Sequence, residues 1–415
     1  MVLVFSHSGF SDTDANGITL KNLLSAIDKE QKAQFYCDTA TPDFTAAQQY
    51  FRVTDVQMLK AFFFRKSKHI FTAQQEQKKA APVRKISGSL KKRKYNFFLK
   101  WLRERLWCIS PWGHRALRSW ITSLAPDAIV YMVGESHFMD KLVLKTCKRT
   151  KKPLILYHAE AYRIIDLNTR RGLDRVYYRK SQKLYARLND LARLIIYQSE
   201  PLQVGYEAKY PHKAQTMLAY NPAQRLQIPY QPNHPLCITY FGNLGVGRHE
   251  SLIETANILQ KLDPELKIDV YGKALAQIED ALRACEGIRF HGFLEQEQLR
   301  EIIAASDILL HVESFSPEIM PKLRFAFSTK IAQCLASGRC FLSYAPETAA
   351  SSQYLRSVGA PIACDARQLE VLLSQMIADE ALRKKSVEKC LRIAEKNHDL
   401  ERTAVCVREA ILRLG

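Results

Sequence analysis

The sequence predicts an α/β protein built from two doubly wound domains with parallel sheets. Apolar segments of strand length alternate with amphipathic helical segments in both halves of the chain. A proline-rich stretch at 229–235 has neither helical nor strand periodicity and interrupts this alternation. The length of 415 residues favours two domains over one. Two such domains facing each other would place a ligand cleft between the carboxyl ends of their strands.

The first domain is expected to span 1–222. It begins with a strand at 2–7, followed by a helix at 20–27 and a strand at 34–37. A basic and aromatic segment at about 60–118 is interpreted as an insertion. The later elements of this domain are strands at 128–134, 153–158 and 194–198, with helices at 142–147 and 175–188.

The second domain is expected to span 236–398, after a linker that includes 221–222 and 229–235. A terminal helix at 399–415 is predicted to pack back on the first domain. The expected strands of the second domain are 238–241, 267–271, 288–291, 307–312 and 340–344. They again alternate with helices, which predicts a second parallel sheet covered on both faces.

A glycine-rich turn follows the expected strand at 238–241. Gly242, Asn243 and Gly245 lie in this turn, and Arg248 lies at the start of the next helix. Glycine allows close approach of a ligand to the backbone, and an arginine can bind phosphate through two hydrogen bonds. The glycine spacing differs from the G-x-G-x-x-G and G-K-[ST] motifs, which disfavours NAD binding and ATP hydrolysis.

A second helix start lies at 328–330. Ser328 and Thr329 are residue types that cap helices, Lys330 falls in the first turn, and Gly338 ends the helix. Free backbone amides, the helix dipole and the lysine together predict a phosphate site, and so a nucleoside-diphosphate ligand. The structural alternative is an ordinary capped helix.

The formal net charge of +19 predicts an acidic partner. Between residues 60 and 118 the only acidic residues are Glu76 and Glu104, while basic residues accumulate and aromatic residues lie among them. This mixture suits an anionic membrane surface. The alternative is a solvated basic loop with helices whose aromatic side chains pack in the core. No nucleic-acid-binding motif accompanies the segment, so nucleic acid is not an expected partner.

No apolar run reaches the roughly 18 residues that a membrane span needs, and the first residues read as a strand rather than a signal peptide. A cytoplasmic protein, peripheral on the inner face of the cytoplasmic membrane, is therefore expected. The ten cysteines contain no C-x-x-C pair. Buried free thiols are expected, without a zinc site or a disulfide framework.

These motifs resemble those of retaining glycosyltransferases of the GT-B fold, in particular the group 1-like family that builds bacterial surface polysaccharides. The resemblance covers the C-terminal half well and the N-terminal half loosely. It depends on three segments: 242–248, the turn that contains Gly292 and Phe293, and 328–338.

The resemblance implies a donor site for a nucleoside-diphosphate sugar. By this resemblance, Arg248 and Lys330 would stabilise the departing diphosphate, and Gly292 with Phe293 would line the base pocket. Gln333 stands where many members have a ribose-binding glutamate; an amide can still donate and accept hydrogen bonds but carries no charge. Glu313 and Glu318 follow the strand at 307–312, and either could contact the donor sugar or be a solvated loop carboxylate. No metal or other cofactor is expected.

The acceptor side is expected at the carboxyl ends of the N-terminal strands. His158 and Glu160 follow the strand at 153–158 and are candidate catalytic groups, together with Arg248 and Lys330. The alternative for His158 is a structural histidine. Gly9, Asn16 and Gly17 follow the first strand. They are candidates for letting the acceptor or the diphosphate approach the backbone. The alternative is that they form a plain turn and helix cap.

The predicted function is transfer of a hexosyl group from a nucleoside-diphosphate sugar to a hydroxyl of a lipid-linked bacterial glycan, such as a capsule, O-antigen or lipopolysaccharide precursor. One alternative is a nucleotide-sugar epimerase of the same fold, which needs no acceptor. The other is a noncatalytic basic protein that binds membranes or nucleic acid through residues 60–118.

Overall fold

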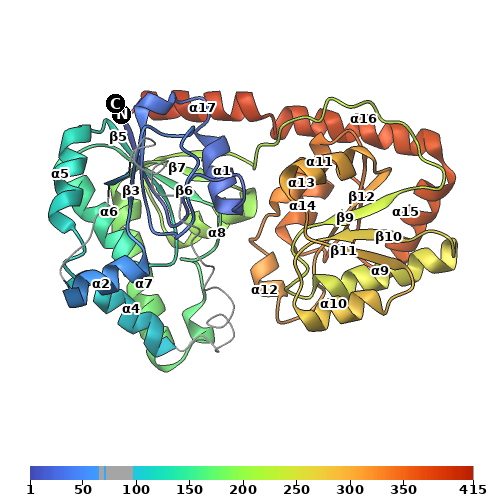
Figure 1. The fold of residues 1–415 in the computed structure, drawn as a ribbon, viewed down its shortest axis with the longest axis horizontal. Coiled ribbons are helices and arrows are strands. Elements are labelled where there is room, and N and C mark those ends of the chain that lie inside the picture. Colours follow the sequence, from blue (N-terminus) through green and yellow to red (C-terminus); the bar gives the residue numbers. More distant parts are fainter. Residues whose placement is uncertain (65–69, 72–96, 415) are drawn as a thin grey trace. The chain divides into compact units, whose positions relative to one another are not determined.

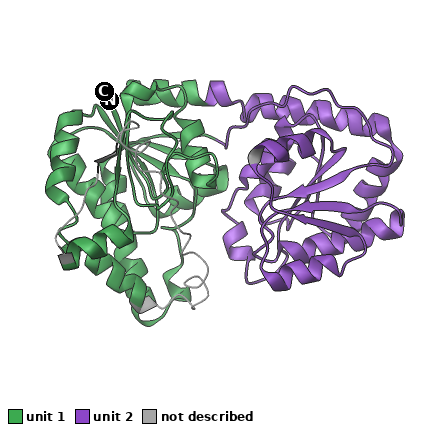
Figure 2. Cartoon of the chain, viewed as in Figure 1, with its two compact units in different colours: residues 1–219, 404–415 green, residues 220–403 purple. Residues whose placement is uncertain are grey.

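The computed structural model describes residues 1–64, 70–71 and 97–414. The chain divides into two compact units (Figure 2): unit 1 comprises residues 1–219 and 404–415, and unit 2 comprises residues 220–403. Each unit contains a mainly parallel sheet with helices on both faces (Figure 1). The predicted fold class is therefore confirmed.

Unit 1 contains an eight-stranded sheet in the order β4-β3-β2-β1-β5-β6-β7-β8. All neighbouring strands are parallel except β4, which is antiparallel to β3. The strands are β1 (Val2–Phe5), β2 (Lys32–Tyr36), β3 (Gln49–Arg52), β4 (Ile70–Phe71), β5 (Ala128–Met132), β6 (Leu154–His158), β7 (Ala192–Tyr197) and β8 (Gln215–Leu218). The α-helices are α1 (Ala15–Leu23), α2 (Asp55–Phe64), α4 (Phe97–Ile109), α5 (His114–Leu124), α6 (His137–Thr150), α7 (Gly172–Leu191), α8 (Glu200–Lys209) and most of α17 (Leu400–Leu412).

Unit 2 contains a six-stranded parallel sheet in the order β11-β10-β9-β12-β13-β14. The strands are β9 (Ile238–Phe241), β10 (Ile268–Tyr271), β11 (Ile288–Gly292), β12 (Ile308–Val312), β13 (Cys340–Tyr344) and β14 (Ile362–Ala363). The helices are α9 (Arg248–Leu262), α10 (Ala276–Arg283), α11 (Gln296–Ala304), α12 (Met320–Leu323), α13 (Thr329–Ala336), α14 (Ala350–Ser357), α15 (Ala366–Ala378) and α16 (Glu380–Asn397).

Most strands of the unit 1 sheet bury alternate side chains on its two faces, whereas the edge strand β8 is largely exposed. On one face, Val2 and Val4 pack with α1 and with Val407 and Ile411 of α17, so the last helix is part of this core. On the other face, Phe35 packs against Trp112, just before α5. This period-2 alternation is what a sheet covered on both sides requires.

The first helix and the linker differ from the sequence-based expectation. Helix α1 begins at Ala15 rather than near residue 20, because Asp14 caps it by accepting a hydrogen bond from Gly17 N at 3.0 Å.

The proline-rich segment belongs to unit 2 and is not a free linker. The Tyr230 hydroxyl and the Asn233 amide each donate a hydrogen bond to Asp307 at 3.0 Å, which ties this segment to the domain.

The basic and aromatic insertion contains core residues. Trp107, Trp112 and Trp120 are buried, so for these three side chains the membrane-surface interpretation is wrong and the core alternative is correct. Trp107 stacks on Phe138 with ring centroids 4.0 Å apart. Four consecutive basic residues of this segment, Lys91, Lys92, Arg93 and Lys94, lie outside the described residues. Among the described residues, no helix is long and apolar enough to cross a lipid bilayer.

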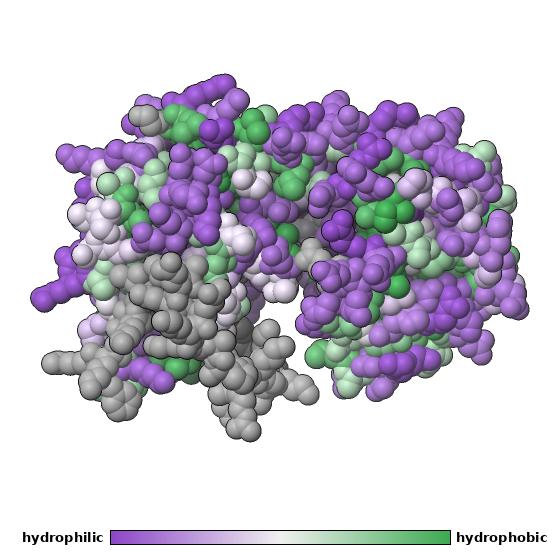
Figure 3. Space-filling model, turned by 45° about the horizontal axis from the view of Figure 1, so that its top comes forward, coloured by the Kyte–Doolittle hydropathy of each residue, from purple (hydrophilic) through white to green (hydrophobic). Residues whose placement is uncertain are grey.

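Hydrophilic residues cover most of the molecular face shown in Figure 3, and hydrophobic residues form small patches on it. All ten cysteines are free. Cys108 and Cys406 are exposed, so the expectation of buried thiols is wrong for these two.

Candidate functional site

The carboxyl edge of the unit 2 sheet holds Lys330 directly over Gly242. Gly242 follows β9, and Lys330 lies in the first turn of α13. A Cβ atom at residue 242 would lie only 1.7 Å from Lys330 Nζ, and Gly242 has a φ of +133°. Only glycine both lacks a Cβ atom and readily adopts a positive φ, so no other residue fits at position 242. The glycine in this turn therefore makes room for the lysine, which is a more specific role than close approach to a ligand.

The Lys330 ammonium forms no hydrogen bond or ion pair with any residue in the described part of the chain. Its ammonium group lies 5.4 Å from the centre of the Tyr240 ring. Burial and the nearby positive charge of Arg248 lower the pKa of Lys330 to about 8. At neutral pH Lys330 is still mainly protonated, and its charge is available to an anionic ligand.

Arg248, by contrast, is already paired. Its Nε donates to Glu313 Oε2 at 2.9 Å and its Nη2 donates to Glu313 Oε1 at 3.0 Å. Glu313 follows β12, the neighbour of β9, and is buried. It is therefore not a solvated loop carboxylate.

His311 completes this buried group. Its Nε2 lies 3.4 Å from Glu313 Oε1, and its Nδ1 lies 3.0 Å from Ser343 Oγ. Burial alone would raise the pKa of Glu313, but His311 and Arg248 outweigh it and lower that pKa. Burial lowers the pKa of His311, so the imidazole is neutral at neutral pH. Glu313 therefore stays ionised and holds Arg248 in place.

Among the other predicted donor residues, Asn243 and Gly292 shape backbone turns, and others have exposed side chains. Asn243 Oδ1 accepts a hydrogen bond from Gly245 N at 2.9 Å, which gives Asn243 a structural role in the turn. Gly292 has a φ of +80°, with open space where a Cβ would lie. The side chains of Phe293, Glu318 and Gln333 are exposed.

The start of α13 follows the predicted capping pattern in its backbone only. Ser328 occupies the N-cap position in an extended conformation, but its side chain makes no capping hydrogen bond. Thr329 is the first helical residue, and Gly338 follows the helix with a φ of +69°. Ser328 therefore takes the predicted N-cap position, but the capping hydrogen bond expected from its residue type is not formed.

Unit 1 has a pocket of about 400 Å³ at the carboxyl edge of its sheet, where β1, β5 and β6 end. Asn16 and Glu160, two of the predicted acceptor-side residues, line it. The full lining is His7, Ser8, Asn16, Asp55, Arg103, Met132, Val133, Gly134, Glu135, Ser136, Ala159, Glu160 and Tyr162. Its mixture of carboxylates, hydroxyls and an arginine is suited to binding a polar molecule.

His158 does not line this pocket, and its burial contradicts the prediction of a catalytic role. The side chain is fully buried, and its Nε2 lies 2.9 Å from the Tyr185 hydroxyl. The ring packs against Tyr197 and Tyr206. Burial lowers the pKa of His158 well below its ordinary value, so it is a neutral core residue. The structural alternative is the correct one.

Gly9 and Gly17 are also packing residues. A Cβ at Gly17 would lie 2.5 Å from Gly9 O, and a Cβ at Gly9 would touch Tyr36 at 3.2 Å. The absence of side chains lets the loop after β1 lie against α1. Neither glycine lines the unit 1 pocket, so the prediction that they approach a ligand is not supported.

Two functional candidates in this pocket were not identified from the sequence. His7 lies just after β1, and burial together with Arg103 and Arg163 lowers its pKa to about 4, so it is a neutral imidazole. Arg103, on α4, donates from Nε to Asp55 Oδ1 at 2.9 Å and from Nη1 to Ser136 Oγ at 3.2 Å. The position of His7 at a strand's carboxyl end was a usable signal, whereas nothing near Arg103 in the sequence indicated its location.

A buried ion pair orders the wall of the pocket. Arg163 and Asp140 are both fully buried, with 2.9 Å between Nη2 and Oδ1. The Tyr131 hydroxyl also donates to Asp140, at 2.8 Å, and Arg163 Nη2 donates to the Gly134 carbonyl, which lines the pocket. These hydrogen bonds hold the loop between β5 and α6 in place. Removing any one of these side chains would leave a buried polar group without its partner.

The two Rossmann-like units, each with candidate groups at the carboxyl edge of its sheet, define the GT-B class of fold. Comparison with solved structures supports this assignment. Anabaena HepE in complex with UDP has a TM-score of 0.65 and 13% sequence identity, covering 100% of each chain. Sucrose-phosphate synthase from Thermosynechococcus elongatus has a TM-score of 0.61 and 14% identity, covering 100% of this chain and 98% of that chain.

A third similar structure is the trehalose-6-phosphate synthase OtsA, with a TM-score of 0.63 and 11% identity, covering 100% of this chain and 99% of that chain. Within the sequence, residues 248–407 match a family described as glycosyl transferase-like. A search of curated proteins found no match. The fold is that of the GT-B glycosyltransferases, and the sequence match lies over the half that contains Arg248, Glu313 and Lys330.

Proposed function

We propose that the protein is a glycosyltransferase that moves a hexosyl group from a nucleoside-diphosphate sugar to a hydroxyl group. The observation that carries this proposal is the unpaired ammonium of Lys330 at the carboxyl edge of unit 2, in a chain with the GT-B fold. The match of residues 248–407 to a glycosyl transferase-like family supports it. The structures of HepE with UDP and with UDP-glucose support a nucleotide-sugar donor.

In the proposed reaction, the bond between the sugar carbon and the diphosphate oxygen breaks, and negative charge builds on the departing diphosphate. Lys330 would stabilise that charge. Arg248 would act beside it in an orientation fixed by Glu313. Retention of configuration and independence from a metal ion are further parts of the proposal, and they derive from the family resemblance.

The unit 1 pocket is proposed to bind the acceptor, a lipid-linked bacterial glycan. His7 is neutral, so a ring nitrogen can accept a hydrogen bond from an acceptor hydroxyl and orient it, although a pKa of about 4 makes the imidazole a weak base. Glu160 and Arg103 add hydrogen-bonding groups around the same cavity. His7 therefore replaces His158, and the predicted Glu160 remains, as the acceptor-side candidates.

Association with the inner face of the cytoplasmic membrane is the remaining part of the proposal. Helices α2 and α4 pack together and expose large apolar side chains. These are Val56, Leu59, Phe62 and Phe63 on α2, and Leu99, Trp101, Leu102 and Ile109 on α4. Apolar side chains beside a basic segment suit the surface of an anionic bilayer.

The test is a product assay with UDP-, GDP- and ADP-sugars, with and without a membrane extract that contains lipid-linked glycans. Glycosylated product that forms only with the extract, together with thermal stabilisation by one nucleotide, supports the proposal. An altered sugar nucleotide formed without acceptor would instead identify an epimerase. No nucleotide affinity, combined with tight RNA or vesicle binding, would identify a noncatalytic adaptor.

A further inference from the structure

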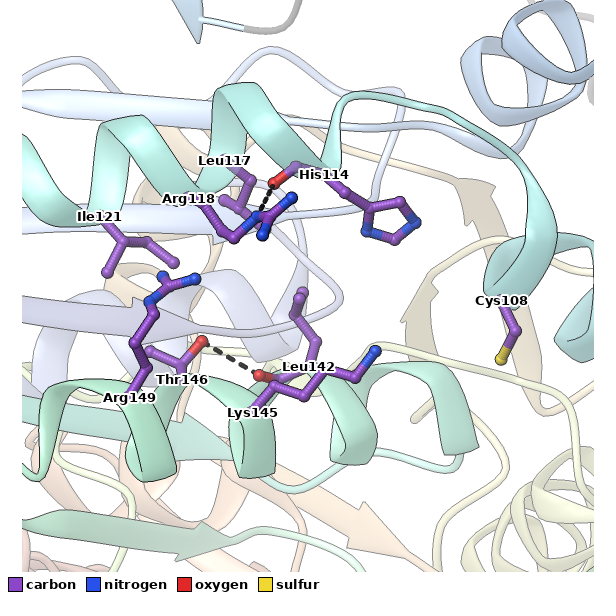
Figure 4. Close-up of a pocket in the computed structure, with 9 residues that line it drawn as sticks. All are labelled: Cys108, His114, Leu117, Arg118, Ile121, Leu142, Lys145, Thr146 and Arg149. Carbon is purple, nitrogen blue, oxygen red and sulfur yellow. Dashed lines mark hydrogen bonds between the residues drawn. The ribbon is translucent and has the colours of Figure 1, made fainter.

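A second cavity of about 330 Å³ lies on unit 1 between helices α5 and α6, here called the α5/α6 groove (Figure 4). It shares no lining residue with the pocket at the carboxyl edge of the sheet. The groove is lined by Cys108 at the end of α4, by His114, Leu117, Arg118 and Ile121 of α5, and by Leu142, Lys145, Thr146 and Arg149 of α6.

The α5/α6 groove carries concentrated positive charge. Arg118, Lys145 and Arg149 come from the two facing helices, and none of the nine described lining residues is acidic (Figure 4). Arg118 Nε donates to the His114 carbonyl at 3.3 Å. Neither Lys145 nor Arg149 forms an ion pair within the described ranges. Three cations around one cavity repel each other, and an anion bound among them would relieve that repulsion.

The position of these charges relative to His114 supports one shared site. Burial and the charges of Lys145 and Arg118, which come from different helices, lower the pKa of His114. The side chains of Lys145 and Arg118 are therefore both close enough to His114 to disfavour its protonation. His114 itself is neutral near pH 7 and can hydrogen-bond to an oxyanion without adding a fourth charge.

The base of the α5/α6 groove is apolar. Leu117 and Ile121 are buried beneath it, and Leu142 lies on the opposite helix. Ile109, next to the lining residue Cys108, is 63% exposed. A small inorganic anion would leave the half-buried Leu142 and the exposed Ile109 in contact with water, whereas an amphiphile would cover them.

We propose that the α5/α6 groove binds the phosphate group of an anionic lipid. Arg118 and Arg149 supply planar guanidinium groups that match phosphate oxygens, and Lys145 supplies a third donor. Leu142 and the exposed Ile109 at the end of α4 contact the start of the acyl chains. This is a second site on the protein, and it does not require the proposed transferase activity.

The first test compares two variants with equal loss of charge. Lys145→Gln/Arg149→Gln removes groove cations, whereas Arg115→Gln/Lys148→Gln removes exposed cations of the same helices that do not line the groove. Co-sedimentation with phosphatidylglycerol–phosphatidylcholine vesicles measures binding. We expect the groove variant to bind roughly tenfold more weakly than the control variant, about 1.4 kcal/mol of binding free energy. Equal losses of vesicle binding in the groove variant and the control variant would overturn the proposal, because a nonspecific electrostatic attraction would weaken equally in both.

The second test uses Cys108 as a reporter in the wild-type protein. Its thiol lines the groove, and the exposed thiol of Cys406, in α17, serves as an internal control. We expect soluble dihexanoyl phosphatidylglycerol to slow alkylation of Cys108 several-fold and to leave Cys406 unchanged. Equal protection by inorganic phosphate would overturn the lipid assignment, and no protection by either would overturn the site. Unchanged thermal unfolding and unchanged nucleotide-induced stabilisation of both double variants would show that the groove acts separately from the donor site.

Discussion

Arg248 and Glu313 form a two-point ion pair, with a shortest distance of 2.7 Å between Nη2 and Oε2. They come from the start of α9 and the end of β12, so the pair joins two neighbouring parts of the carboxyl edge of unit 2. Because Glu313 neutralises Arg248, the positive charge free to bind a diphosphate comes mainly from Lys330. Arg248 then has a structural role as well as the proposed role in binding.

Arg248→Met should destabilise unit 2 strongly, because it leaves the carboxylate of Glu313 buried without its partner. Breaking one side of a buried pair costs about 3–5 kcal/mol of unfolding free energy. The double variant Arg248→Met/Glu313→Gln should recover most of the loss. Thermal and urea unfolding measure both changes.

Arg289→Met is the matched control. Arg289 also pairs with a carboxylate through two hydrogen bonds, to Asp269 at 2.9 and 2.8 Å, but its side chain is 54% exposed. Its loss should cost less than about 1 kcal/mol. If the two arginine variants unfold alike, burial of Glu313 does not determine the strength of the pair.

The contribution of Glu313 should depend on pH. Its pKa in the folded protein lies below the ordinary value of 4.5. The stabilisation is therefore fully present above about pH 4.5 and is lost as the pH falls through the lowered pKa. The difference in melting temperature between wild type and Glu313→Gln should shrink on acidification. A constant difference from pH 7 to pH 3 would contradict this assignment.

Lys330→Met should weaken nucleoside-diphosphate binding at pH 7 roughly tenfold or more, since a charge-assisted contact contributes about 1.5–3 kcal/mol. In the wild type, affinity should also fall as the pH rises above about 8, where the free ammonium loses its proton. The methionine variant should lack this pH step. Calorimetric titration of UDP at pH 7 and pH 9 measures both effects, with Lys322→Met on α12 as the control. Equal affinity of the wild type at both pH values would argue against a role for Lys330.

Gly242→Ala should displace the Lys330 side chain, because the new methyl group would lie 1.7 Å from Nζ. The loss of nucleotide affinity should be close to that of Lys330→Met, and the combined variant should bind no more weakly than either one alone. Gly245→Ala is the control, because the nearest atom to its Cβ is Asn243 Oδ1 at 3.2 Å. Additive losses in the Gly242 and Lys330 variants would show that the two residues act independently.

Trp107→Ala and Trp101→Ala should change different properties, the first the stability of the protein and the second its binding to vesicles. Trp107 is buried and its Nε1 donates to Asp55 Oδ1 at 2.7 Å, so its loss should cost about 3–5 kcal/mol of stability. Trp101, on the same helix, is 40% exposed, so its loss should leave the melting temperature nearly unchanged and weaken vesicle binding. Vesicle binding that is insensitive to Trp101 would count against a membrane contact through α4.

The sequence indicated the parallel sheets and the candidate donor-site residues because those signals are local. A strand followed by glycines, or a capped helix start with a lysine, is visible within about ten residues. Glu313 was identified as a candidate, but its pairing with Arg248, 65 residues away, was not. His158 looked like a ligand-facing residue because strand ends usually face the site, and only the packing of three tyrosines around it shows otherwise.

What the sequence alone determined is the class of fold and two candidate cations, Arg248 and Lys330, each at a helix start. Periodicity and helix-end chemistry depend on neighbours along the chain, so they can be read without coordinates. The tertiary structure decided which charges are neutralised, which aromatic rings are buried, and which residues share a cavity. Those properties depend on distances between segments far apart in sequence, as for Arg103 with Asp55 and for Arg118 with Lys145, and the fold alone sets these distances.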